Sequence, residues 1–210
     1  MCSQITLMEM LMRFCIYLII LCALCACSAN KNVRGGPQGV TDQQKSVTSQ
    51  TPFKVLVEDF NDFKAASLTI EQSPSEELKP YLKRMETELS KMFARAEKLK
   101  EDFEGLSGLG QQFENLSSIA YISMIYYHLH DQLVHLQPPS SFDEQAQALF
   151  TSVMKEKVDP LLRKSKEASK TFKDVCARAK MTSQCERFIE SHQDDLPVQV
   201  ATETIKKPKE

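Results

Sequence analysis

Three polar side chains in the second half of the chain have the residue types of a metal site. His128, Asp131 and His135 are spaced three and then four residues apart, so a helix would place them along one face. Two imidazoles and a carboxylate form a ligand set that zinc accepts. The two histidines would, however, lie about 10.5 Å apart along the helix axis, too far to share one ion easily. We therefore interpret them as the polar edge of an amphipathic helix, and predict no metal and no cofactor.

The sequence has no motif typical of catalysis. It contains no Gly-x-Ser-x-Gly, His-Glu-x-x-His or Cys-x-x-Cys pattern, and no glycine loop that binds phosphate. The glycines at 105, 108 and 110 are typical of a turn between helices. The formal net charge of −2 provides no basic excess that would attract nucleic acid. We predict that the protein is not an enzyme and does not bind nucleic acid.

The N-terminal residues have the pattern of an export signal. Arg13 precedes an uninterrupted apolar run of 13 residues, Phe14–Ala26. A membrane-spanning helix needs about 20 apolar residues, whereas the apolar part of a signal peptide needs only about 7–15. We therefore predict a signal peptide over residues 1–26.

The end of this run, Leu24-Cys25-Ala26-Cys27, resembles the lipobox of bacterial lipoproteins. The resemblance implies that the thiol of Cys27 receives a diacylglyceryl group, and that Cys27 becomes the first, often palmitate-bearing residue of a membrane-anchored protein. By resemblance to enterobacterial sorting, Ser28 in the next position implies the outer membrane, on its periplasmic face or at the cell surface, in preference to the inner membrane. Two alternatives stay open: export with cleavage but no lipid, and an uncleaved single-pass anchor.

The seven cysteines divide according to this prediction. Four would leave with the signal peptide and Cys27 would carry the lipid, so that Cys176 and Cys185 remain in an oxidising compartment. An even pair favours a disulfide, and two separate buried thiols are the alternative. Unbroken helix would separate them by about 13.5 Å, whereas a disulfide needs Cα atoms within about 7 Å. The bond therefore requires the chain to reverse between Lys180 and Ser183.

The remaining sequence predicts an all-α protein. Residues 27–52 are polar and include a Gly-Gly-Pro-Gln-Gly cluster, so we expect a flexible tether behind the lipid. Residues 193–210 lack periodicity, and we expect a disordered tail. Residues 53–192 show helical periodicity throughout. We predict that they form a four- to five-helix bundle or a TPR-like array of helical hairpins.

Two helices are expected in the first half of this domain. The first begins at Phe53, although the Val-Leu-Val that follows leaves a strand possible. The second opens with a capping box, Ser73–Glu76, and repeats apolar residues in alternating three- and four-residue steps as far as Phe103. That spacing is typical of a seam resembling a coiled coil.

Three helices are expected in the second half. In the one over residues 109–137, the central stretch from Ile119 to Tyr127 is apolar on nearly every face, so we expect this helix at the centre of the domain. The next opens with a capping box, Ser141–Glu144, reaches about Lys180, and contains Pro160, where we expect a kink or a break. A short helix over residues 183–192 follows.

Residues 116–192 resemble helical-hairpin segments of tetratricopeptide-type periplasmic proteins of deltaproteobacteria. A Tyr-rich helix, the Pro138-Pro139 break, an acidic helix start, and Pro160-Leu161 before a Lys- and Ala-rich helix carry the resemblance. It implies a scaffold that binds protein. We expect a non-catalytic envelope lipoprotein whose partner is another envelope protein.

A small-ligand or lipid carrier is the alternative function. In a carrier, the aromatic helix over residues 109–137 would line a cavity instead of filling one. Tyr121, Met124 and Tyr127 are the residues expected to line it.

Overall fold

A computed structural model describes residues 52–66, 68, 70–73, 75–107 and 113–197. The predicted signal peptide, Cys27 and the tether before Pro52 lie outside the described residues. The chain divides into two units, 1–49 and 50–210, and all described residues belong to the second. Its elements are α2 (Pro52–Ala65), α3 (Leu78–Ser107), α4 (Phe113–Val134), α5 (Glu144–Arg178), α6 (Thr182–Ser191) and the 3₁₀ helix η1 (Gln193–Asp195).

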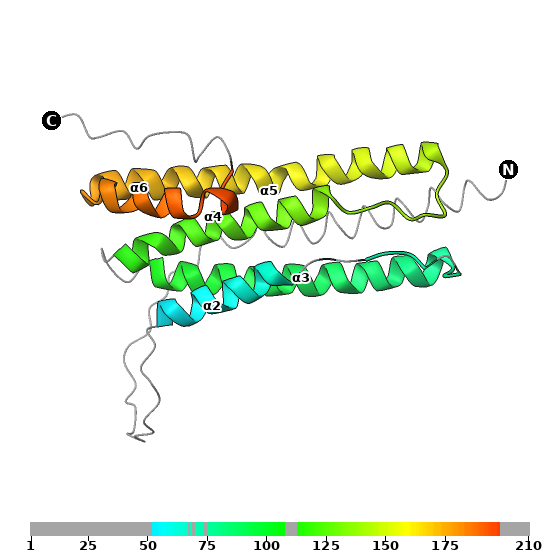
Figure 1. Ribbon diagram of the computed structural model, residues 1–210, viewed down its shortest axis with the longest axis horizontal. Coiled ribbons are helices and arrows are strands. Elements are labelled where there is room, and N and C mark those ends of the chain that lie inside the picture. Colours follow the sequence, from blue (N-terminus) through cyan, green and yellow to red (C-terminus); the bar gives the residue numbers. More distant parts are fainter. Residues whose placement is uncertain (1–51, 67, 69, 74, 108–112, 198–210) are drawn as a thin grey trace, which may run out of the picture. The chain divides into compact units, whose positions relative to one another are not determined.

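The prediction of an all-α bundle is confirmed. The described residues contain helices and no strand, so the strand left open near Phe53 is not formed. Consecutive helices run in alternating directions (Figure 1). No helix among the described residues is both long enough and apolar enough to cross a membrane.

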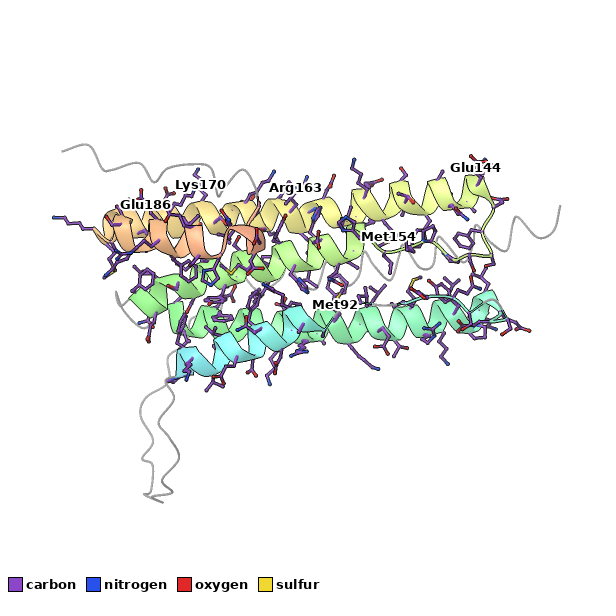
Figure 2. All side chains as sticks on the ribbon, viewed as in Figure 1. Met92, Glu144, Met154, Arg163, Lys170 and Glu186 are labelled. Carbon is purple, nitrogen blue, oxygen red and sulfur yellow. A yellow bond between two sulfur atoms is a disulfide. The ribbon has the colours of Figure 1, made fainter. Side chains whose placement is uncertain are left out.

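Helix α4 is the centre of the bundle. It contacts α2, α3, α5 and η1 (Figure 1). Every residue from Ala120 to Ile125 is buried, which confirms the prediction that this apolar helix lies inside the domain. Charged side chains occupy the outer faces of the surrounding helices: Arg163 and Lys170 point away from the bundle, whereas Met154 lies on the inner side of α5 (Figure 2).

An aromatic cluster around Tyr121 joins α4 to three other helices. The Tyr121 ring stacks on Phe103 of α3, with centroids 5.0 Å apart. Phe53 and Phe60 of α2 meet it edge-on at 5.7 and 5.3 Å, and Phe188 of α6 does so at 5.8 Å. Burial raises the pKa of Tyr121 to about 12. The cluster therefore fills the space between these helices.

Three buried serines join α4 to α5. The Ser123 hydroxyl donates to the backbone carbonyl of Ser165 at 2.8 Å, and its oxygen lies 2.6 Å from Oγ of Ser169. Ser165 returns a hydrogen bond to the Ser123 carbonyl, also at 2.8 Å. Because the side chains are small, the two helices approach closely, and because they are bonded to one another, the buried hydroxyls carry no desolvation penalty.

The predicted disulfide is present. Cys176 and Cys185 are bonded, with Cα atoms 6.3 Å apart, and both are buried. The chain reverses between α5 and α6, as the predicted bond requires. In the chain-entropy description, closing a loop of this length stabilises the fold by about 2–3 kcal/mol.

Hydrogen bonds at the end of α5 produce this reversal. The Met181 amide donates to the Cys176 carbonyl at 3.0 Å, and the Lys180 amide donates to the Ala177 carbonyl at 3.2 Å. This pair of bonds is a Schellman motif. It places Lys180 at φ 59°, in the left-handed region that usually holds glycine.

The helix before α4 begins later than predicted. The Ser73 amide donates to the Glu76 carboxylate, which is one half of the predicted capping box, but α3 starts only at Leu78. Glu76 also holds Arg84, with 2.7 Å between the charged atoms. The Glu76 carboxylate is therefore shared with a side chain nearly two turns into the helix, and residues 75–77 lie ahead of α3.

The cap of α5 is also shifted. Asp143, not Ser141, is the N-cap, and its carboxylate accepts from the Ala146 amide at 2.8 Å. The Ser141 hydroxyl instead donates to the side-chain oxygen of Gln72 at 3.2 Å. A long-range contact thus takes the hydroxyl that the local pattern assigns to the cap.

Helix α5 continues through Pro160 without the predicted break. Proline removes one backbone donor from a helix and costs about 3 kcal/mol. Buried residues stand on both sides, Met154 and Val158 before it and Leu161 and Ser165 after it. Ending the helix at Pro160 would expose one of these two sets, so packing against α4 outweighs the local preference.

The folded part extends beyond the predicted boundary at residue 192. Residues 193–195 form η1, and Leu196 is only 2% exposed. The predicted tail therefore begins no earlier than residue 198, and residues 198–210 lie outside the described part of the chain.

Replacing Ser123 is expected to destabilise the bundle. Ser123→Ala removes the bonds to Ser165 and Ser169 and should lower the free energy of unfolding by about 1–2 kcal/mol. Ser123→Leu should cost more, because it also forces a larger side chain between two closely packed helices. Urea denaturation measures both.

Ser152→Leu is the matched control, because Ser152 is an exposed serine on α5, the helix that Ser123 packs against. Its free energy of unfolding should change by less than about 0.5 kcal/mol. Equal stabilities for Ser123→Leu and Ser152→Leu would contradict the role of the serine contact.

Candidate functional site

A hollow beside α4 contains His128. It has a volume of about 290 Å³ and lies where α2, α4 and η1 meet. We call it the His128 hollow; its lining residues are Phe60, Lys64, Met124, Tyr127, His128, Asp131, Gln132, Asp194 and Asp195.

An ion pair joins two walls of this hollow. Nζ of Lys64 on α2 lies 2.5 Å from Oδ1 of Asp195 on η1. The His128 ring meets Phe63 edge-on at 5.2 Å. Burial lowers the pKa of His128, and the positive charge of Lys64 lowers it further, while the carboxylates of Asp131 and Asp195 oppose the shift. His128 is therefore neutral at pH 7.

The three residues with metal-ligand types do not converge. His135 lies just past the end of α4, exposed, with Nδ1 3.4 Å from Oδ1 of Asp131. His128 and Asp131 both line the His128 hollow, whereas His135 is not among its lining residues. Among the described residues, no group of three or more His, Cys, Asp or Glu side chains is placed to hold a metal ion.

The three residues predicted to line a carrier cavity lie in two different places. Tyr121 lies inside the aromatic cluster, where rings surround it. Met124 and Tyr127 do line the His128 hollow. The hollow lies where α2, α4 and η1 meet, whereas Tyr121 is enclosed by aromatic rings.

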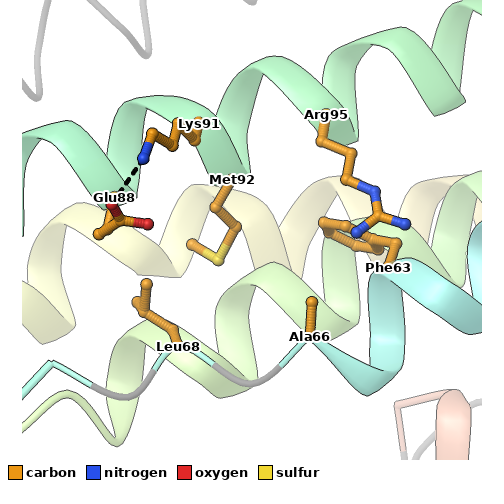
Figure 3. A pocket seen from close by; sticks show the side chains of 7 residues that line it. All are labelled: Phe63, Ala66, Leu68, Glu88, Lys91, Met92 and Arg95. Carbon is orange, nitrogen blue, oxygen red and sulfur yellow. Dashed lines mark hydrogen bonds and ion pairs between the residues drawn. The ribbon is translucent and has the colours of Figure 1, made fainter.

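A second hollow lies on the surface between α2 and α3. It has a volume of about 180 Å³ and combines apolar walls with a charged rim (Figure 3). We call it the α2–α3 recess; its lining residues are Phe63, Ala66, Leu68, Glu88, Lys91, Met92 and Arg95.

Long-range hydrogen bonds hold the segment that forms one wall of the recess. Gln132 of α4 accepts from the Leu68 amide at 2.8 Å. Two residues further on, the Ile70 carbonyl accepts from the Tyr81 hydroxyl at 3.2 Å. Leu68 and Ile70 are therefore tied to α4 and α3 respectively.

The charged side chains on the rim of the recess differ in their interaction partners. Nζ of Lys91 lies 2.7 Å from the Glu88 carboxylate. The Arg95 guanidinium lies over the Phe63 ring, 5.8 Å from its centroid, and donates to the Asp59 backbone carbonyl at 3.4 Å. In the part of the chain that the structure describes, no carboxylate lies within ion-pair distance of Arg95.

Only part of the α2–α3 recess could be predicted from the sequence. Met92 belongs to the predicted apolar stripe of α3, and Lys91 and Arg95 are four residues apart, so they share a helix face. The opposite wall comes from Ala66 and Leu68, which belong to no periodic apolar pattern. Their position depends on the bond from Leu68 to Gln132, a residue 64 positions away.

The remaining candidate residues differ in what the structure says of them. Cys176 and Cys185 form the disulfide, whereas Cys27 lies outside the described residues.

The sequence matches no family model, no curated protein and no solved structure.

The pH dependence of stability should report the burial of His128. Because its pKa is lower in the folded state than the ordinary 6.5, the unfolded chain binds the proton more readily. The contribution of His128 to stability is complete above pH 6.5 and is lost as the pH falls through the folded pKa. His128→Gln should therefore flatten the fall in stability below about pH 6.5, measured by urea denaturation at several pH values.

His135→Gln is the control, since it removes an exposed imidazole from the same region. If it flattened the curve as much as His128→Gln, burial of His128 would not explain the pH dependence. Proton NMR titration of His128 in the folded protein gives the lowered pKa directly.

Proposed function

We propose that the protein is an envelope lipoprotein whose folded domain is a non-catalytic protein-interaction module. The observation that carries this proposal is the α2–α3 recess, which presents on the surface of the bundle apolar side chains and an arginine that pairs with no carboxylate of the described residues. Contact sites between proteins are enriched in arginine and methionine, and depleted of lysine and glutamate.

The filled interior supports a function at the surface. Five aromatic rings meet around Tyr121, and the serines between α4 and α5 are bonded to one another. Where a helical bundle is close-packed at its centre, recognition depends on its outer faces.

The sequence supports the anchor. The lipobox-like residues Leu24–Cys27 imply a diacylglyceryl group on Cys27, and two or more acyl chains hold a protein stably on a membrane. A coil of about 25 residues between Cys27 and α2 would give the domain a reach of about 25–30 Å from the lipid. The resemblance of residues 116–192 to tetratricopeptide-type proteins agrees with a scaffold.

Metabolic labelling with palmitate tests the anchor. The wild-type protein should incorporate label and stay with the membrane fraction, and Cys27→Ser should do neither. Cys25→Ser is the matched control, since it changes a cysteine in the same segment that does not directly follow the predicted cleavage site. Equal labelling of wild type and Cys27→Ser would refute lipidation at this residue.

Photo-crosslinking in intact cells tests the interaction module. A photoreactive residue is placed at Lys91, on the recess, or at Lys170, on the outer face of α5, and both positions are exposed. A discrete adduct with one envelope protein from either position supports the module. Absence of any adduct above background from both positions would contradict it.

One observation favours the alternative, a small-ligand carrier. Met124 and Tyr127 line the His128 hollow, as predicted for a carrier, and the hollow holds about 290 Å³. Native mass spectrometry of the purified protein would detect a bound small molecule. If one is found, Tyr127→Ala should release it, and Lys170→Ala should not.

A further inference from the structure

We propose that the α2–α3 recess binds a peptide segment of a partner protein that presents one aliphatic side chain next to a carboxylate. This inference rests on the proposed interaction module and names the chemistry of its partner. The argument depends on the size of the recess, on its walls and on its charges.

The size of the recess suits one side chain. Its volume is about 180 Å³, and an apolar cavity of about 150 Å³ is enough to hold benzene. Phe63, Leu68 and Met92 supply apolar walls, with the Met92 side chain pointing toward Leu68 across the opening (Figure 3). Methionine is flexible and polarisable, so it adapts to side chains of different shape.

The charge of the rim favours a carboxylate. The Arg95 guanidinium lies over the Phe63 ring, 5.8 Å from its centroid, and directs one donor to a backbone carbonyl. A guanidinium has five N–H donors in a planar fork that fits both oxygens of a carboxylate. Lys91 and Glu88 neutralise one another on the rim, so the charge left for a ligand is positive.

The spacing of these groups suits adjacent residues of a peptide. Arg95 and Met92 are three residues apart on α3, which places their Cβ atoms about 5–6 Å apart. A ligand therefore needs its carboxylate and its apolar group a few ångströms apart. An Asp or Glu beside Leu, Ile, Val or Met satisfies this, and so does a C-terminal aliphatic residue with its own carboxylate.

The recess is also prepared for binding. The hydrogen bonds from the Leu68 amide to Gln132 and from the Tyr81 hydroxyl to the Ile70 carbonyl fix the wall that Leu68 forms. A preformed site avoids the entropy cost of ordering a loop on association.

Selection from a displayed library of random heptapeptides on the immobilised full-length protein tests the proposal. The enriched sequences should share an Asp, a Glu or a free C-terminus beside an aliphatic residue. A synthetic copy of an enriched peptide should bind Arg95→Gln at least about tenfold more weakly than wild type, measured by fluorescence anisotropy. Its Asp→Asn or Glu→Gln analogue should lose a similar factor on wild type.

Arg163→Gln is the matched control, since Arg163 is exposed on the opposite side of the bundle. It should bind the peptide as wild type does. Met92→Ser gives a second test through the apolar wall. For all variants, thermal melting followed by circular dichroism shows whether the fold is retained.

Three outcomes would overturn the proposal: no enrichment, enrichment without the acidic-aliphatic pair, or equal binding of the peptide to wild type and Arg95→Gln. Self-association that Arg95→Gln abolishes would assign the recess to a second copy of this chain and would also overturn it. The crosslinking experiment distinguishes failure of the recess proposal from failure of the proposed interaction module. A partner captured from Lys170 but never from Lys91 supports the module and contradicts the recess.

Discussion

The arrangement of the domain depends on one constraint: α4 is apolar on nearly every face and must be covered on all of them. A helix with a polar side can rest on one neighbour, whereas α4 needs α2, α3, α5 and η1 around it. Burying apolar area stabilises by about 25 cal/mol per Å², so the order of the surrounding elements follows from covering this helix. The disulfide then ties α6, which brings Phe188 to Tyr121, onto α5.

The neighbouring helices cover α4 unevenly. The His128 hollow and the α2–α3 recess both result from this uneven packing. The serines bring α5 close to α4, and large rings separate α4 from α2 and α3. Helix α2 has 14 residues and α3 has 30, so α2 ends before it covers its neighbours completely. Its last turns stand between the two hollows: Phe63 lines the recess on one side, and Phe60 and Lys64 line the His128 hollow on the other.

Features set by local pattern could be predicted from the sequence, and those set by distant contacts could not. The apolar stripes predict the helices and the buried central helix, and the number of cysteines predicts the disulfide. The shift of the α5 cap needs Gln72, and the continuation through Pro160 needs α4. Leu196 follows two aspartates, so its burial is invisible to periodicity. The α2–α3 recess combines a predictable feature with an unpredictable one. Met92 belongs to the apolar stripe of α3, whereas Leu68 is positioned by its hydrogen bond to Gln132.

The same packing bears on the choice between a surface function and a carrier. A ligand at the centre of the bundle would have to displace Tyr121 from its stacking on Phe103 and from the rings around it. Truncating a large buried aromatic costs about 3–5 kcal/mol, so a central cavity would need a ligand that recovers most of that loss. A ligand in either marginal hollow displaces only water. Recognition at the edges of α2 therefore costs the fold least, and of the two edges the recess presents the arginine that no carboxylate of the described residues engages.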